Sequence, residues 1–223
     1  MKIFAWIKAL LYPEKCVLCG RILEKDQLDL CRKCRIEQPD CPISRDKYPY
    51  LDSWTALWYY QGDVRRSLLK YKFYGRRNYA DAYGRLLSMK LLREDRLQAD
   101  VITWIPISEK RLKKRGFDQV ELLAQKMTQQ LQIPAVALLW KRRDNPQQSK
   151  IVGQAQRRAN VLGAYEAIQR EMLVGKRVLL LDDILTTGAT AGECARILLE
   201  AGAKEVHFAA VAAAQKKNPN RKV

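Results

Sequence analysis

Two adjacent carboxylates followed by a run of hydroxyl residues form the most informative group of side chains in this sequence. Asp182 and Asp183 can accept hydrogen bonds from the vicinal hydroxyls of a sugar. Hydroxyls and backbone N–H groups for a phosphate at a helix start would come from the residues that follow: Thr186, Thr187, Gly188, Ala189 and Thr190. Residues 181–190 therefore predict a loop that binds a sugar phosphate. The alternative is an acid-capped strand-to-helix turn that holds no ligand.

A strand, a helix and a second strand are needed to position this loop. Val178 to Leu181 is a continuous apolar run, as expected for a parallel strand that is covered on both faces. Beyond the loop, apolar residues recur at helical spacing from 195 to 199, and Gly202 ends the helix before an apolar strand at 206–211. The loop is thereby placed at the carboxyl end of a strand, where open α/β sheets bind ligands.

The loop closely resembles the signature of type I phosphoribosyltransferases, in which apolar residues and an acidic pair precede Thr-Thr-Gly-x-Thr. The resemblance implies a ligand, 5-phosphoribosyl 1-pyrophosphate (PRPP) or a close ribose 5-phosphate relative, with Mg²⁺ on its pyrophosphate and ribose oxygens. It also implies that an earlier loop, Ser108 to Asp118, binds the pyrophosphate, with Arg111 and Arg115 as bidentate donors. A solvated basic loop is the alternative for the lysines of this segment. A core strand at 100–106 precedes it and a helical pattern at 119–131 follows it.

Four cysteines near the amino terminus form two Cys-x-x-Cys pairs, Cys16 with Cys19 and Cys31 with Cys34. Two residues between thiolates allow a tight turn to point both sulfurs at one centre, and two such turns complete a tetrahedral shell for Zn²⁺. Reduced thiols or a pair of disulfides are the alternatives. With four ligands there is no open coordination position, so we expect a structural metal, with Cys41 left as a spare residue.

Further runs narrow the resemblance to the ComF family of competence-related proteins: residues 115–119, 143–148, 157–160, 163–165 and the four-cysteine module. The resemblance implies a flexible loop within 141–160 that closes over the substrate. Its pyrophosphate and flexible-loop residues would be Ser108, Arg111, Arg115, Gln148 and Arg157. Asp118 and Asn145 depart from the pattern, since Asn and Thr are expected there. Membership would imply a cytoplasmic protein that handles single-stranded DNA in natural transformation, with a protein partner in the DNA uptake machinery.

The charge of the chain is compatible with polyanionic partners. Lys and Arg number 41 against 24 Asp and Glu, which gives a formal net charge of +17. The stretch from Val64 to Arg77 contains no acid and interleaves aromatic rings with cations, so it is a candidate for single-stranded nucleic acid. The candidate contacts are Arg65, Arg66, Lys70, Lys72, Arg76 and Arg77. An amphipathic helix that packs on the core is the equally favoured alternative.

We therefore expect an α/β protein with a parallel, type I phosphoribosyltransferase-like sheet flanked by helices. A zinc module would occupy 1–45 and the larger domain 46–223, with a hood at 46–96 and the core at 97–215. The apolar stretch 3–11 is too short to span a membrane, which favours a cytoplasmic location. Neither an acceptor nor a general base is indicated. The alternative to a transferase is a noncatalytic module that senses PRPP or binds DNA or a protein.

Overall fold

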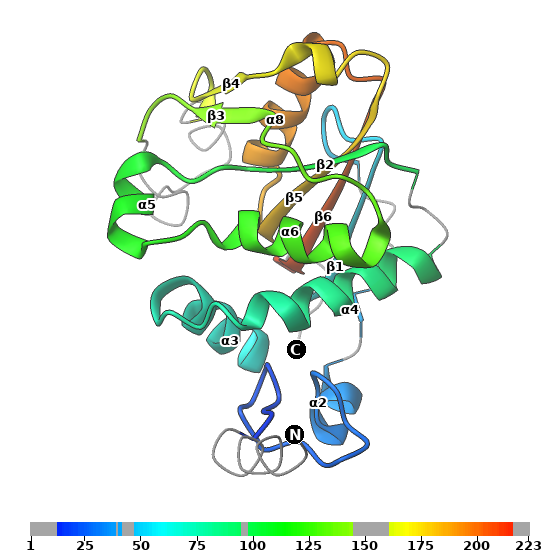
Figure 1. Cartoon of the computed structure of the whole chain (residues 1–223), viewed down its shortest axis with the longest axis vertical. Helices are drawn as coiled ribbons and strands as arrows, with labels where there is room; N and C mark the ends of the chain where they lie inside the picture. Colours follow the sequence, from blue (N-terminus) through cyan, green and yellow to red (C-terminus); the bar gives the residue numbers. More distant parts are fainter. Residues whose placement is uncertain (1–12, 39, 42–46, 95–97, 145–160, 216–223) are drawn as a thin grey trace, which may run out of the picture.

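The computed structural model describes residues 13–38, 40–41, 47–94, 98–144 and 161–215. Its main sheet has four parallel strands in the order β1-β6-β5-β2 (Figure 1). These strands are β1 (Ser53–Tyr59), β2 (Val101–Trp104), β5 (Arg177–Leu185) and β6 (Glu205–Ala213). In the sheet, Leu180 of β5 pairs with Thr103 of β2 on one side and with Phe208 of β6 on the other. The strand β5 is therefore central, which confirms the expected parallel sheet. It runs to Leu185, beyond the predicted end at Leu181, so Asp182 and Asp183 lie in the strand and not in the loop that was expected at 181–190.

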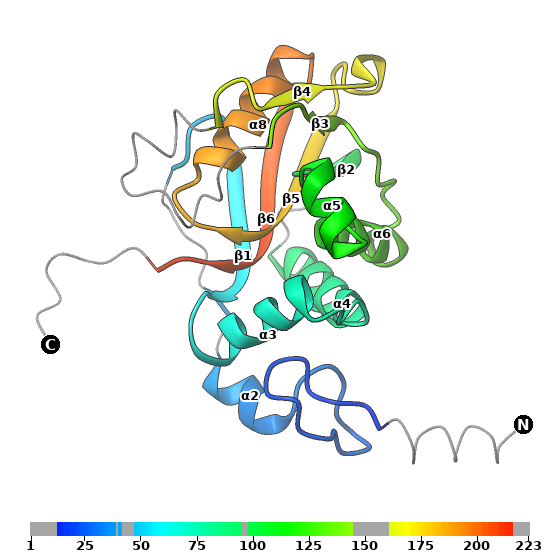
Figure 2. The same cartoon turned by 90° about the vertical axis from the view of Figure 1, so that its left-hand side faces the viewer.

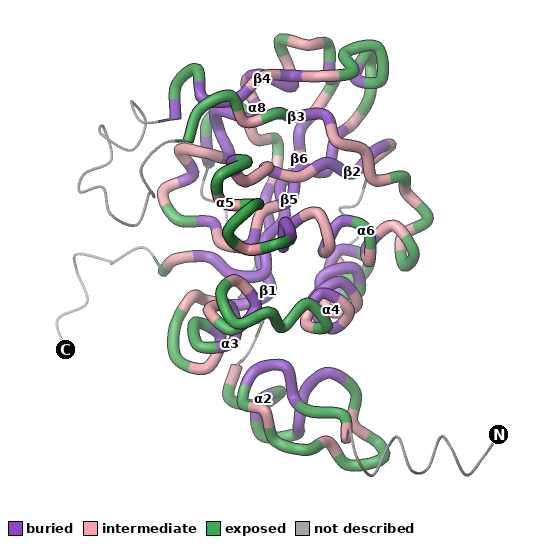
Figure 3. The backbone as a smooth tube through the Cα atoms, turned by 60° about the vertical axis from the view of Figure 1, so that its left-hand side comes forward, coloured by how far each residue is buried: buried purple, intermediate pink, exposed green. Residues whose placement is uncertain are grey.

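Helices cover both faces of the sheet, and the apolar residues of β5 alternate between the two layers. Leu179 and Leu181 belong to the buried cluster that includes α4 (Tyr79–Arg93) and α6 (Gln119–Leu131). Val178 and Leu180 belong to the cluster on the other face, which includes α8 (Ala189–Glu200). The strand has an unbroken apolar sequence because both of its faces are dry. Figure 3 shows the buried strands between these layers. No helix in the described part of the chain combines the length and apolarity needed to cross a membrane.

The segment 108–118, expected to be a loop, contains the helix α5 (Glu109–Arg115). The Ser108 hydroxyl accepts a hydrogen bond from the N–H of Arg111 at 3.4 Å, and Gly116 ends the helix with a φ of 76°. A serine cap and a terminal glycine are ordinary helix signals. Seven residues are too few to show a helical period, and the basic composition of the segment favoured the prediction of a loop.

Three short elements complete the upper part of the molecule in Figure 1. β3 (Leu139–Lys141) and β4 (Tyr165–Ala167) form an antiparallel pair beside α8, and a 3-10 turn, η2 (Arg170–Met172), follows. The register places Lys141 opposite Tyr165. The residues between these strands that fall in 145–160 lie outside the described part of the chain.

The range assigned to a hood, 46–96, supplies both a strand and two helices. Its strand, β1, pairs with β6 in the main sheet, so α3 (Gly62–Phe73) and α4 are the parts that lie outside the sheet. α3 begins three residues after β1 ends, which places it beside the carboxyl ends of the strands (Figure 2). Tyr71 and Leu68 of α3 are fully buried, so the basic stretch is an amphipathic helix.

The cysteine module packs on the helices α3 and α4 (Figure 2). It contains an isolated bridge between Lys15 and Ile22 and the short helix α2 (Arg32–Glu37). The Ser67 hydroxyl of α3 donates to the carbonyl of Val17. The Arg85 guanidinium of α4 donates to the carboxylate of Asp29 at 3.0 Å. Helix α3 is therefore attached to the cysteine module on one side and to the sheet domain on the other.

The connector between the module and β1 packs against the loop that follows β5. A Cβ atom on Gly188 would lie 2.0 Å from Cδ1 of Tyr48, and one on Gly192 would lie 3.1 Å from the carbonyl oxygen of Pro49. The Tyr48 ring is held by an edge-to-face contact with Trp54, with centroids 5.5 Å apart. Gly188 is required both by its φ of 75° and by the ring that fills the space of a side chain.

We expect Gly188→Ala to lower the free energy of unfolding more than Gly175→Ala does. Both glycines have positive φ, 75° and 67°, where a Cβ atom costs about 1–2 kcal/mol. Nothing lies within 4 Å of the added Cβ at Gly175, whereas the Tyr48 ring blocks it at Gly188. Overpacking should therefore cost Gly188→Ala about 1–3 kcal/mol more. Denaturant titration measures both losses, and equal losses would contradict the close packing of Tyr48.

Candidate functional site

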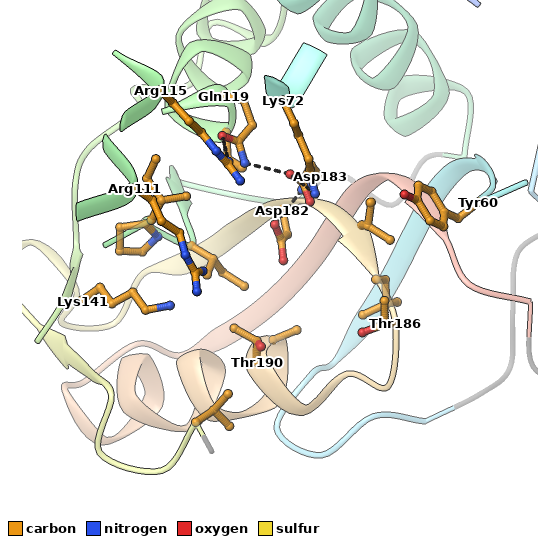
Figure 4. A pocket seen from close by; sticks show the side chains of 18 of the residues that line it. Tyr60, Lys72, Arg111, Arg115, Gln119, Lys141, Asp182, Asp183, Thr186 and Thr190 are labelled. Atoms are coloured by element: carbon orange, nitrogen blue, oxygen red, sulfur yellow. Dashed lines mark hydrogen bonds and ion pairs between the residues drawn. The ribbon is translucent and has the colours of Figure 1, made fainter. Parts of the chain in front are cut away.

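A pocket of about 470 Å³ opens at the carboxyl end of β5. Its walls come from α3, α5, the start of α6, the β3–β4 pair and the loop that leads into α8 (Figure 4). Asp182 and Asp183 lie at its base, and Thr186, Gly188 and Thr190 line one side. Five of the seven residues predicted to bind the sugar phosphate thus line one cavity, whereas Thr187 and Ala189 do not line it.

The two carboxylates of this pocket have different surroundings. Oδ2 of Asp183 forms an ion pair with Nζ of Lys72 at 2.7 Å and accepts a hydrogen bond from Nε2 of Gln119 at 2.8 Å. Nη1 of Arg115 in turn donates to Oε1 of Gln119 at 2.8 Å. Oδ1 of Asp182 accepts from the backbone N–H of Asp183 at 2.7 Å. Figure 4 shows Lys72, Gln119 and Arg115 converging on the acidic pair from three helices.

These contacts divide the protonation behaviour of the pair. Burial raises the pKa of Asp182 well above its ordinary value, and the neighbouring Asp183 carboxylate raises it further. Burial would also raise the pKa of Asp183, but the charge and hydrogen bond of Lys72, aided by Gln119, outweigh it and hold that pKa below its ordinary value. Asp183 therefore stays ionised. Asp182, which lines the pocket, is the carboxyl of the pair that takes up a proton more readily.

The start of α8 supplies donors on the opposite side of the pocket. Gly188 is its N-cap residue, with no side-chain hydrogen bond in the cap, and no acid occupies its first turn. The N–H of Ala189 has a hydrogen bond to Oγ1 of Thr187, at a long 3.4 Å. Backbone N–H groups at the amino end of a helix of 12 residues favour a bound anion, since the helix dipole is positive there.

The residues predicted to bind pyrophosphate already hold a carboxylate. Oδ1 of Asp144 accepts a hydrogen bond from the Ser108 hydroxyl at 2.6 Å and lies 3.5 Å from Nε of Arg111. The hydrogen bond from Ser108 lowers the pKa of Asp144, so the carboxylate remains charged. An internal anion thus occupies two of the predicted anion-binding groups. The other two flexible-loop predictions, Gln148 and Arg157, lie outside the described residues.

Sequence reasoning did not assign three residues that the structure places in or beside the site. Lys141, at the end of β3, lines the pocket; its Nζ donates to the Tyr165 hydroxyl at 3.0 Å. Burial lowers the pKa of Lys141, and nearby Arg111 lowers it further. Gln119 holds Asp183, as described above. Asp118, which departs from the family pattern, caps α6: its Oδ1 accepts from the N–H of Val120 at 2.8 Å.

The six cations proposed for nucleic acid do not share one surface. Lys72 points into the pocket, and Arg65 also lines it. Arg77 donates to the carbonyl of Gly116 at 3.0 Å and stacks over Phe117. All of the six except Lys72 are exposed. Those that neither line the pocket nor contact Gly116 are Arg66, Lys70 and Arg76, of which Arg66 pairs with Asp63. They lie near the exposed Phe73 and Tyr74 in the sequence.

The four predicted metal ligands converge. The Sγ atoms of Cys16, Cys19, Cys31 and Cys34 all lie within 4.8 Å of one another. Those of Cys19 and Cys31 are 3.7 Å apart, and two sulfurs bound tetrahedrally at about 2.3 Å from Zn²⁺ would be about 3.8 Å apart. Cys41 and Cys194 are buried elsewhere and do not belong to the cluster. The donor set fits a closed, structural zinc site.

Comparisons with known proteins agree with this geometry. Residues 120–222, which include α6, β5 and the segment 181–190, match the family model of the phosphoribosyl transferase domain. Over 86% of its length the chain is 29% identical to Competence protein ComFC of Streptococcus pneumoniae, of which it covers 96%. It is 27% identical to DNA utilization protein YhgH of Escherichia coli O157:H7, with 86% of each chain covered.

Among solved structures, glutamine phosphoribosylpyrophosphate amidotransferase from B. subtilis overlaps 63% of this chain and 30% of that one, with 27% identity and a TM-score of 0.42.

We expect the purified protein to hold one equivalent of zinc and to lose the fold of residues 13–41 when the metal is removed, because the module buries little apolar surface of its own. Elemental analysis of the wild type, of Cys31→Ser and of the control Cys41→Ser checks this. Cys31→Ser should lose metal and Cys41→Ser should retain it. A reduced, folded and metal-free wild type would contradict the assignment.

Proposed function

We propose that this chain, a homologue of the ComF-type competence proteins with a phosphoribosyl transferase domain, binds PRPP in the pocket at the end of β5 and serves the cytoplasmic handling of single-stranded DNA. The observation that carries the PRPP proposal is the pairing, across one pocket, of an acidic pair with an uncapped helix start. A carboxylate pair suits ribose hydroxyls, and the helix start suits the 5-phosphate.

The charge of the pocket supports a ligand with several phosphates. Two carboxylates line it among the described residues, against five cations: Arg65, Lys72, Arg111, Arg115 and Lys141. A cavity of about 470 Å³ also lies within the range of about 300–1,000 Å³ that is usual for small-molecule sites. A sugar that carries both a monophosphate and a pyrophosphate would be matched by this excess of positive charge.

The acidic pair also fits Mg²⁺, which prefers oxygen ligands and keeps substrate phosphates in its shell. Asp182 is the residue that would approach it, since Lys72 already engages Asp183. When bound, the ion would neutralise charge on the departing pyrophosphate. The residues of this chain would hold the ribose, orient C1 and bind the pyrophosphate. An acceptor nucleophile would then form a bond to C1 as the bond from C1 to the pyrophosphate oxygen breaks.

A second candidate is a noncatalytic module that binds PRPP as a signal. The observation that favours it is the contact of Asp144 with Ser108 and Arg111, because this carboxylate already occupies two of the groups that would receive a departing pyrophosphate. A measurement of pyrophosphate release in the presence of protein, PRPP and candidate acceptors separates the two. A transferase releases pyrophosphate when its acceptor is supplied, whereas a sensor saturates with PRPP and releases none.

We expect wild-type protein to bind PRPP and Asp182→Asn to bind it more weakly by about 1–3 kcal/mol, because a charge-assisted hydrogen bond to ribose is lost. Since burial raises the pKa of Asp182, wild-type affinity should also increase as the pH rises through that pKa. Calorimetry across pH checks both effects. The control Asp81→Asn breaks a surface ion pair with Lys126 outside the pocket and should bind as the wild type does. Unchanged affinity in Asp182→Asn would contradict the site.

The proposed DNA surface consists of the exposed cations Arg66, Lys70 and Arg76 with the exposed rings of Phe73 and Tyr74. Tyr74 is 74% exposed and offers a ring for stacking with bases. Phe73 is 54% exposed, lines the pocket and has the Arg115 guanidinium 4.9 Å from its ring centroid. The formal net charge of +17 favours approach of a polyanion. The names of the relatives, competence and DNA utilization proteins, support a role in DNA uptake.

Replacing Arg66, Lys70 and Arg76 together by Gln should weaken binding of a single-stranded oligonucleotide and reduce its salt dependence. Each phosphate contact contributes about 0.7 to the slope of log affinity against log salt, so the slope should fall by about 2. Fluorescence anisotropy at several salt concentrations measures this. As a control, replacing Arg170, Lys176 and Lys204 together by Gln removes the same amount of charge from the opposite end of the sheet. Equal losses in both triple variants would refute a localised surface.

A further inference from the structure

Lys72 differs from the other lysine of the same helix, Lys70, although the two are separated by one residue. The Lys70 side chain is exposed, whereas the Lys72 side chain is 17% exposed and lies in the pocket. Its Nζ reaches Oδ2 of Asp183 at 2.7 Å, and the Asp183 side chain is 8% exposed. An ammonium that is shielded from water and paired at this distance is part of the site rather than of the solvated surface.

The contacts around Asp183 show what this lysine does. One carboxylate oxygen can accept about two hydrogen bonds, and Oδ2 of Asp183 already receives Lys72 and Gln119. Ligand hydroxyls must therefore be received by the remaining oxygens of the acidic pair. The ammonium also offsets one of two adjacent negative charges, which lowers the repulsion that a pyrophosphate would meet on entering the pocket.

The same contact fixes the end of α3. Tyr71, the residue before Lys72, donates from its hydroxyl to the backbone carbonyl of Gln119. Tyr71 and Lys72 thereby join α3 to the start of α6 and to the end of β5, the two elements that position Asp183. Ser67, which lies five residues before Lys72 on α3, donates a hydrogen bond to the carbonyl of Val17 in the cysteine module.

We propose that Lys72 is the positioning residue of the sugar-phosphate site: it docks α3 on the end of β5 and fixes Asp183, so that the remaining carboxylate oxygens of the pair receive the ligand. This role rests on the proposed PRPP site. Its effect on Asp183 exists without ligand and is measured separately below.

The charged and titratable groups around Asp183 come from four elements. They are Lys72 and Tyr71 on α3, Arg115 on α5, Asp118 at the start of α6, and Asp182 on its own strand, with the neutral amide of Gln119 completing the shell. Lys72 is the cation in direct contact with this carboxylate, at 2.7 Å. Removing it should leave the Asp183 charge uncompensated and loosen α3 from the end of β5, whereas a change at a distant surface lysine should not.

The first experiment uses protein without ligand. Amide hydrogen exchange follows the end of α3 and the end of β5 in the wild type, Lys72→Met, Lys72→Arg and Lys126→Met. Lys126 is a matched control because its Nζ also pairs with an aspartate at 2.8 Å, that of Asp81, on the surface. We expect faster exchange at the ends of α3 and β5 in Lys72→Met, a return toward the wild type in Lys72→Arg and no change in Lys126→Met. Unchanged exchange in Lys72→Met would overturn the role assigned to Lys72.

The second experiment measures PRPP affinity of the same four proteins by calorimetry. Lys72→Met should bind PRPP about tenfold or more weakly, the size expected when a hydrogen bond to a charged group is lost, and Lys72→Arg should recover most of that loss. Failure of the wild type to bind PRPP would refute the proposed function, while the hydrogen-exchange result would still decide whether Lys72 docks α3 on β5. Wild-type PRPP affinity in Lys72→Met, combined with weaker oligonucleotide binding, would overturn the proposal and place Lys72 in the DNA surface.

Discussion

The ion pair between Lys72 and Asp183 is the contact on which the arrangement of the pocket depends. It joins a helix outside the sheet to the strand that contains the acidic pair, at 2.7 Å, between side chains that are 17% and 8% exposed. Gln119 completes the attachment from a third element. Breaking a buried pair by removing one partner typically costs more than the pair contributes, because the other charge is left uncompensated. Removal of either partner would therefore leave an uncompensated charge at the wall of the pocket.

This constraint extends to the cysteine module. Helix α3 carries Lys72 near its end and, one and a half turns earlier, Ser67, which is bonded to Val17 between the first two cysteines. Val17 and Leu18 are buried in the same cluster as Leu68 and Tyr71 of α3. A structural metal can stabilise the fold of a small segment that has little hydrophobic core of its own. The module thus supports, from below, the helix that closes one side of the pocket.

Local patterns in the sequence were sufficient for the central sheet and the four-cysteine cluster. They also placed the acidic pair near the carboxyl end of β5, although the pair lies in the strand and not in a loop. Each of these predictions depends on residues that are close in the chain, such as the alternation of Leu179 and Leu180 between two covered faces. Contacts between distant segments were not accessible in this way. Lys72 was assigned to the nucleic-acid surface with its basic neighbours because no residue near it in the sequence indicates a contact with Asp183. The sequence around Lys141 likewise does not indicate its hydrogen bond to Tyr165. Helix α5 was missed because seven residues show no period.

The structure of the protein in complex with PRPP and Mg²⁺ tests the central claim most directly. We expect ribose hydroxyls to lie within about 3.2 Å of oxygens of Asp182 or Asp183. We also expect the 5-phosphate to contact the N–H groups at the start of α8 and Nζ of Lys72 to remain on Asp183. A ligand bound away from the end of β5, or a complex in which Lys72 has left Asp183, would contradict this claim.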